Sequence, residues 1–191
     1  DVNGNIYIGG GTVSGKVTLP PGKNYSGPNP GAGKVFGTPT LPILPEMPSI
    51  TNFPPFPQLA DINSTRSISP GAYDDIKLQG NKTLTFNGPG TYIFDKIDNK
   101  NSNSFVFDFK NNSTGVFKIF VHNNVDLAKI SVSMKNGGSA SRIFTEVHGD
   151  NNYSFIIANG SSSSSATKWL GTVWAPYGAI SVGSGTGNSN I

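Results

Sequence analysis

The chain of 191 residues contains no cysteine. This absence excludes disulfide bonds, thiol nucleophiles and thiolate metal sites. The fold must therefore be stabilised by packing alone. Stacked repeats meet this requirement, because each repeat covers the apolar face of the one before it.

Charge is scarce, at 13% of residues, and the net charge of +3 is not concentrated anywhere. The lysines lie singly from Lys16 to Lys168, and Arg66 and Arg142 are the two arginines. Nucleic-acid binding needs clustered cations, so we predict no nucleic-acid partner. No apolar run approaches the roughly 20 residues of a membrane-spanning helix, so we expect no membrane insertion.

A helical hydrophobic period is also missing, and apolar residues instead alternate with polar ones in short runs. Such runs include Leu84 and Phe86, then Phe105, Phe107 and Phe109, then Phe117, Ile119 and Val121, then Ile130, Val132 and Met134. A period of two predicts strands with one buried face. The chain also holds 24 glycines and 14 prolines. We therefore predict an all-β fold with many turns, of a composition that suits an extracellular protein.

A short pattern occurs twice, as Ser69–Tyr73 and as Asn87–Tyr92, with its prolines 19 residues apart. Each copy leads from a Pro-Gly turn into a β-rich run, and about 20 residues is the length of one coil in a stacked array. The strand steps agree, with 21 residues from Leu84 to Phe105 and 25 from Phe105 to Ile130. The pattern predicts a β-solenoid (β-helix) with irregular Asn, Gly and Ser turns.

Seven prolines fall between Thr38 and Gln58, and the residues among them include Leu41, Met47, Phe53 and other apolar side chains. Prolines at this density favour an extended segment that cannot enter a ladder. Because the spacers are apolar, we expect an extended Pro-rich strap packed on the outside of the solenoid. The alternative is a flexible tether between two modules.

The predicted organisation is a single β-solenoid module over residues 1–191. It comprises N-terminal strands at 1–35, the Pro-rich strap at 36–58 and regular coils at 59–191. The chain begins at Asp1 without Met and stops where another strand is expected to begin, so we interpret it as a processed or excerpted piece. A coil end exposes unpaired backbone, and we expect a neighbouring rung or chain to stack on the open C-terminal end at Ile180–Ile191.

Several segments carry a family resemblance, namely Pro70–Ile76, Gly80–Phe86, Gly88–Phe94, Arg142–Glu146 and Gly171–Gly178. Together these segments resemble the β-helical domain of large secreted bacterial surface proteins of the adhesin type, over most of Ile68–Ile191. The resemblance implies an exported, repetitive, adhesin-like module at the bacterial cell surface. It brings no catalytic residues and no cofactor with it.

Three aromatic residues, Trp169, Trp174 and Tyr177, are close in sequence and are the candidate ligand-binding residues. Aromatic faces suit the apolar face of a sugar ring, so the trio could form a stacking platform. The alternative is that Trp174 packs in the last coil.

Ionisable residues offer further candidates, each with a structural alternative. Glu146 and His148 share a strand face with Arg142 and could form a metal or acid/base pair, but an ordinary charge ladder explains them too. His122 stands beside two asparagines. Five aspartates, at positions 74, 75, 95, 98 and 108, suggest a polysaccharide lyase or glycosidase, although their spacing fits turns better.

The function we predict is a non-catalytic structural or adhesive module of an exported bacterial cell-surface protein, self-assembling end to end. The expected partners are a cell-surface or matrix glycan or protein, and we predict no metal, no cofactor and no enzymatic activity. A glycan-binding module is the first alternative, and a β-helical polysaccharide-degrading enzyme is the second.

Overall fold

A computed structural model describes residues 4–9, 11–38, 53–55, 59–150, 152–158, 167–184 and 189–190. The chain divides into two compact units, Asp1–Ile50 (unit 1) and Thr51–Ile191 (unit 2). Each unit is described by itself, and the single module predicted for residues 1–191 stays a prediction. The described residues form strands and one 3₁₀ turn, η2 (Ala140–Arg142), so the all-β class is confirmed. No described helix has the length and apolar character needed to span a membrane.

Unit 1 contains four short strands in two parallel pairs. They are β1 (Ile6–Tyr7), β2 (Val17–Leu19), β3 (Tyr25–Ser26) and β4 (Lys34–Phe36). β3 pairs with β1 and β4 with β2, so the chain passes the same two positions twice in the same order. All three residues of β2 are buried, whereas Tyr7 and Phe36 are exposed.

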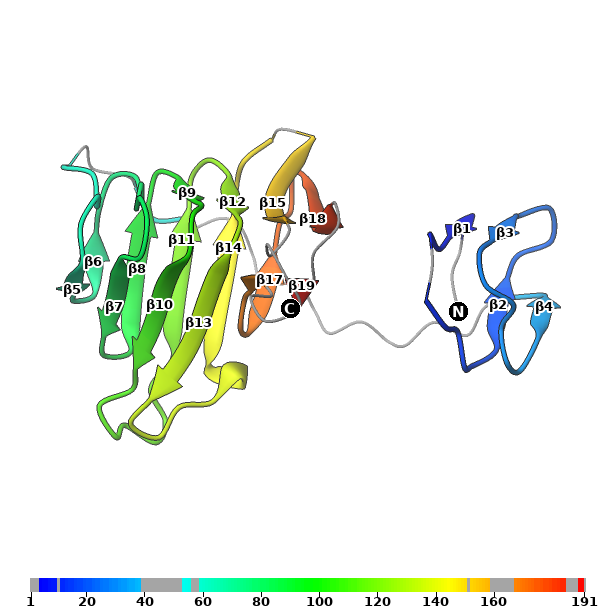
Figure 1. Cartoon of the computed structure of the whole chain (residues 1–191), viewed down its shortest axis with the longest axis horizontal. Coiled ribbons are helices and arrows are strands. Elements are labelled where there is room, and N and C mark those ends of the chain that lie inside the picture. Colours follow the sequence, from blue (N-terminus) through cyan, green and yellow to red (C-terminus); the bar gives the residue numbers. More distant parts are fainter. Residues whose placement is uncertain are drawn as a thin grey trace. The chain divides into compact units, whose positions relative to one another are not determined.

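Unit 2 is built on three parallel sheets, with strand orders β13-β10-β7-β5, β17-β14-β11-β8-β6 and β18-β15-β12-β9 (Figure 1). A further parallel pair joins β16 and β19. The strands are β5 (Arg66–Ile68), β6 (Gly71–Ala72), β7 (Thr83–Asn87), β8 (Gly90–Phe94), β9 (Ile97–Asn99), β10 (Asn103–Asp108), β11 (Phe117–Val121), β12 (Val125–Leu127), β13 (Ile130–Lys135), β14 (Ile143–Val147), β15 (Tyr153–Ala158), β16 (Thr167–Lys168), β17 (Thr172–Trp174), β18 (Ala179–Ser184) and β19 (Ser189–Asn190).

Successive strands visit the three sheets in a constant order. The chain passes through β7, β8 and β9, then through β10, β11 and β12, then through β13, β14 and β15, and each pass adds one parallel strand to each sheet. We call one such pass a layer. The arrangement follows from the alternating sequence, because each strand turns its apolar residues inward onto those of the layers on either side.

The core of unit 2 consists of apolar ladders that run from layer to layer. Leu84 pairs with Phe105, which confirms the predicted step of 21 residues. Phe105 pairs in turn with Val132, so the predicted partner Ile130 is wrong. Ile130 lies opposite Asn103, because β10 begins at this buried polar residue.

Buried Asn103 is accommodated because its side chain is fully hydrogen-bonded. Its Nδ2 donates to Asn99 Oδ1 (2.9 Å), Lys100 O (2.6 Å) and Leu78 O (3.2 Å), and its Oδ1 accepts from Lys82 N (2.8 Å). A buried amide with these partners pins one turn to the turn of the layer before it.

The two Pro-Gly copies adopt matching local structures. In each, the tyrosine hydroxyl donates to the carbonyl four residues earlier: Tyr73 to Ser69 O (2.6 Å) and Tyr92 to Gly88 O (2.7 Å). The ladder nevertheless pairs Gly71 with Tyr92, so the spatial step is 21 residues and not the 19 of the sequence pattern. Tyr92 is therefore buried in the core while Tyr73 is half-buried.

Candidate functional site

The predicted aromatic platform is not assembled, because Trp169 lies inside the core with 1% of its surface exposed. Its ring meets those of Phe105, Phe107 and Phe155 edge-on, and its Nε1 donates to Thr145 Oγ1 (3.2 Å). Burial makes Trp169 unavailable for stacking on a ligand, and the prediction of a ligand-binding role for this residue is corrected accordingly.

The two other predicted residues lie nearer the surface. Trp174 is half-buried on β17, where it pairs with Glu146 of β14. Tyr177 is 55% exposed, and its ring meets His148 edge-on at 5.1 Å. Ligand binding by Trp174 and Tyr177 stays a prediction.

Glu146 and His148 come together on the outer face of the five-stranded sheet. His148 Nε2 donates to Glu146 Oε1 at 2.6 Å. The neighbouring residues Ile143 and Val147 point inward and are buried, as the alternation requires. Glu146 is only 4% exposed although it faces outward, so something covers it.

Part of the cover is the described piece of the Pro-rich segment. The Phe53 ring stacks on His148 at 3.5 Å and meets Phe120 and His122 edge-on. His122 Nε2 lies 2.8 Å from Pro54 O, and since a carbonyl only accepts, this nitrogen donates. Residues 53–55 thus pack on the outside of unit 2, while the remainder of the predicted strap, 39–52 and 56–58, lies outside the described residues.

This geometry describes a clasp more closely than a catalytic pair. The His148 ring is enclosed by the Glu146 carboxylate, the Phe53 face and the Tyr177 edge. A general base needs a path to substrate, and here an aromatic ring occupies that path. The pair holds the Pro-rich segment against the sheet through stacking and a hydrogen bond.

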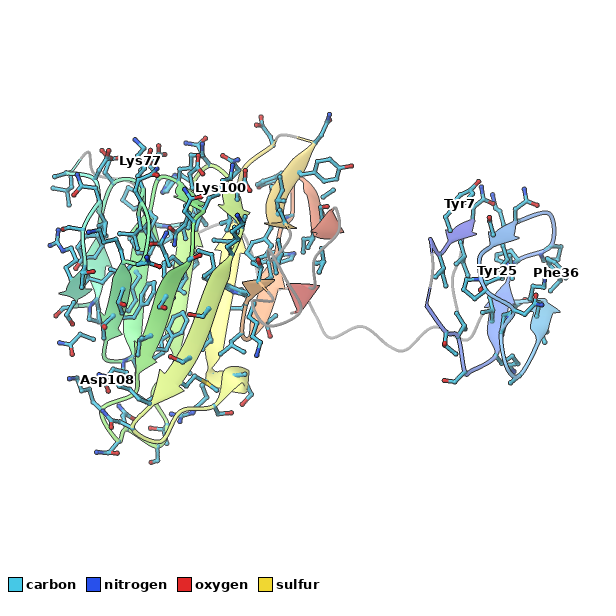
Figure 2. The ribbon with its side chains drawn as sticks, viewed as in Figure 1. Tyr7, Tyr25, Phe36, Lys77, Lys100 and Asp108 are labelled. Atoms are coloured by element: carbon cyan, nitrogen blue, oxygen red, sulfur yellow. The ribbon has the colours of Figure 1, made fainter. Side chains whose placement is uncertain are left out.

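Asp61, Asp74 and Asp75 place carboxylate oxygens within 4.8 Å of one another. Lys77 Nζ answers this charge, at 3.1 Å from Asp61 and 2.9 Å from Asp75 (Figure 2 labels Lys77). Hydrogen bonds to Asp75 and Asp61 raise the pKa of Lys77, and desolvation together with the neighbouring carboxylates raises that of Asp74. The group is an ion-pair cluster, and nothing in it points to a bound cation.

Asp108 is nearly buried at the end of β10, between the ammonium groups of Lys110 (3.0 Å) and Lys135 (3.4 Å) (Figure 2). Burial alone would raise its pKa. Hydrogen bonds from the Lys110 backbone and from the Asn136 amide, together with the two lysines, outweigh burial and hold the pKa of Asp108 well below its usual range. The carboxylate ties together the turns of two layers.

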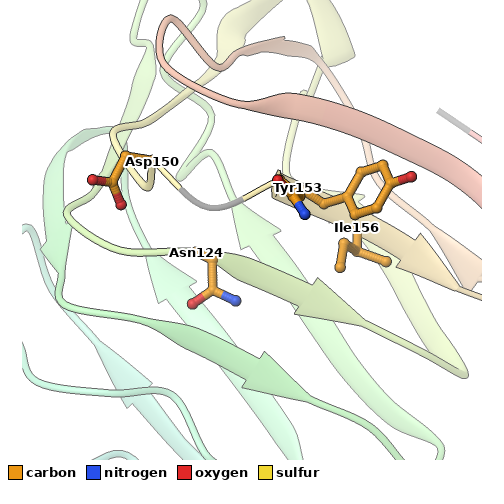
Figure 3. A pocket seen from close by; sticks show the side chains of 5 residues that line it. Asn124, Asp150, Tyr153 and Ile156 are labelled. Carbon is orange, nitrogen blue, oxygen red and sulfur yellow. The ribbon is translucent and has the colours of Figure 1, made fainter.

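An open hollow lies elsewhere on unit 2, lined by Asn124, Asp150, Asn152, Tyr153 and Ile156 (Figure 3). The sequence analysis did not single out any of these residues. The one available signal was a polar Gly-Asp-Asn run that leads into a tyrosine, and such a run is equally typical of an ordinary turn.

Comparisons with family models, with curated proteins and with solved structures found no match to this chain.

Proposed function

We propose that unit 2 is a β-solenoid that serves as a non-catalytic structural and adhesive module at the surface of a bacterial cell. The constant visiting order of the three parallel sheets and their in-register ladders support a solenoid. Cysteine-free stacking and the scarcity of charge suit a repetitive exported element.

Engagement of the aspartates supports the absence of catalysis. Asp98 pairs with Lys96 and Lys100, Asp95 accepts from Asn123, and Asp108 is held by two lysines. A glycosidase needs two carboxyl groups that face one substrate groove at a defined separation. The aspartates just named instead bind groups of their own fold.

The observation that carries the proposal is an unfinished ladder at one end of unit 2. Phe155 and Ile157 are fully buried, whereas their partners Ile180 and Val182 on β18 are 42% and 43% exposed. Among the described strands, β18 forms a ladder with β15 alone. An apolar strand with a free hydrogen-bonding edge is a template for a further strand.

We assign that place to a second copy of this chain, stacked head to tail. At the opposite end, β5 and β6 each pair on one side only among the described strands, so a complementary edge exists on every copy. Such a contact is heterologous and does not close on itself, so it produces filaments.

Sedimentation velocity over a range of concentrations tests this proposal. The wild-type chain is expected to form assemblies that grow with concentration, and the double variant Ile180→Lys, Val182→Lys is expected to stay monomeric. The matched control Val116→Lys, Tyr177→Lys places the same charges at exposed apolar residues away from the edge. A wild-type chain that remains monomeric at every concentration would contradict end-to-end stacking.

A further inference from the structure

The hollow lined by Asn124, Asp150, Asn152, Tyr153 and Ile156 has a floor and a rim of different chemistry (Figure 3). We propose that it binds a neutral glycan, with the Tyr153 ring against the apolar face of a pyranose and the amide and carboxylate groups on its hydroxyls. The inference gives the adhesive role of the proposed function a ligand class, and it does not depend on end-to-end stacking.

A β-bulge creates the apolar side of the hollow. Tyr153 pairs with Ala179 and Phe155 with the next residue, Ile180, so Ser154 is an extra residue in β15. As a result, Ser154 and Phe155 are both buried, which strict alternation forbids. The same shift leaves Tyr153, 52% exposed, on the outer side with half-buried Ile156, where regular alternation would separate them.

The polar side of the hollow is held in place by the layer beneath it. A side chain at Gly149 would place its Cβ 2.5 Å from Asn123 O, so only glycine allows this close approach of the two turns. The Ser154 hydroxyl donates to Gly149 O, and Asn123 Nδ2 donates to Asp95 Oδ1 at 2.6 Å. The loop that carries Asp150 is therefore pinned at both of its ends.

The polar groups of the hollow are available to a ligand. In the described part of the chain, no ion pair or side-chain hydrogen bond engages Asp150, Asn124, Asn152 or the Tyr153 hydroxyl. Figure 3 shows Asn124 and Asp150 on one side of the hollow, with Tyr153 and Ile156 on the other. Donors, acceptors and an aromatic ring thus surround one open space.

This combination selects the chemical class. No lysine or arginine lines the hollow and one carboxylate does, so phosphates and nucleic acids are repelled. A single carboxylate is too few for a hard cation that requires six or more oxygen ligands. A pyranose offers C–H groups to the ring and several hydroxyls, and a charged carboxylate is the strongest acceptor for them.

The experiment is saturation-transfer difference NMR on the full chain, with maltotetraose, cellotetraose and mannotetraose as probes and a titration of each sugar that responds. At least one tetrasaccharide is expected to receive saturation from the wild type. Tyr153→Ala should weaken its affinity by about tenfold or more, and Asp150→Asn by several-fold, since each removes contacts made directly to the sugar.

Tyr7→Ala is the matched control, because Tyr7 is a more exposed tyrosine that lies in unit 1. Its affinity should equal that of the wild type. Thermal melting of each variant verifies that Tyr153→Ala and Asp150→Asn remain folded. The absence of transfer to all three sugars, or equal affinity in wild type and Tyr153→Ala, would overturn the proposal while leaving the sedimentation result on stacking unaffected.

Discussion

Single polar residues inside unit 2 hold its turns together. Asp108 joins two lysines, an asparagine and a backbone amide, and Arg142 donates to the carbonyls of Asn112, Gly115 and Gly137. The Arg142 guanidinium also lies over the Phe109 ring, 4.3 Å from its centroid. Turn carbonyls and buried acids that lack partners would be costly, so these residues secure the turns in a chain without disulfides.

We expect Asp108→Asn to destabilise unit 2 by about 1–3 kcal/mol, because buried donors lose a charged acceptor. The folded pKa of Asp108 lies below its ordinary value of 3.8, so the carboxylate contributes stability above that pH. This stability is lost as the pH falls through the folded pKa. Urea unfolding of both proteins between about pH 7 and 2 should show their difference shrinking in acid.

The control for this prediction is Asp98→Asn. Asp98 also pairs with two lysines but is 38% exposed, and exposed pairs contribute about 0–1 kcal/mol. Equal losses in the two variants would show that burial of Asp108 does not set its contribution.

Turns between strands set how closely the layers approach. Gly171, which precedes β17, has a φ of +97°, and a Cβ there would lie 2.1 Å from Ile143 O of the layer beneath. We expect Gly171→Ala to cost roughly 2–5 kcal/mol, because a strained backbone and a backbone clash combine. Thermal or urea unfolding measures this loss.

Gly183 provides the matched comparison for Gly171. Its φ is +80°, but no atom lies within 4 Å of an added Cβ. Gly183→Ala should therefore cost only about 1–2 kcal/mol, from the left-handed backbone alone. A loss at Gly183 as large as that at Gly171 would assign the whole effect to φ and none to the contact between layers.

Strand parity was readable from the sequence, but departures from it were not. Alternation identified the inward faces of β7, β10 and β11 correctly, because their apolar residues keep a strict period of two. Glu146 shares the outward parity and is nevertheless buried, since Phe53 and its neighbours come from far along the chain. The bulge at Ser154 left no local signal, so the hollow beside Tyr153 could not be foreseen.

At the scale of the whole molecule, the large hydrophobic cluster belongs to unit 2 alone. Its members run from Ile62 to Trp169 and include none from unit 1. We therefore expect residues 51–191 to fold independently of unit 1. The fragment should keep the far-UV circular dichroism of its strands and unfold cooperatively in urea.

The comparison for this fragment is the unfolding midpoint of the full chain. A midpoint within a few degrees of the full-length value would show that unit 1 adds little to the stability of unit 2. A fragment that does not unfold cooperatively would show that unit 2 depends on residues 1–50.

The layered hydrogen bonding of unit 2 also determines how it would respond to mechanical force. Ladder bonds run from layer to layer, so tension applied to the last layer opens its few bonds first and leaves the others intact. Each layer that detaches releases roughly 70–100 Å of chain. A pulled molecule therefore lengthens stepwise at nearly constant load, and it dissipates work in each step where a rigid tether would snap.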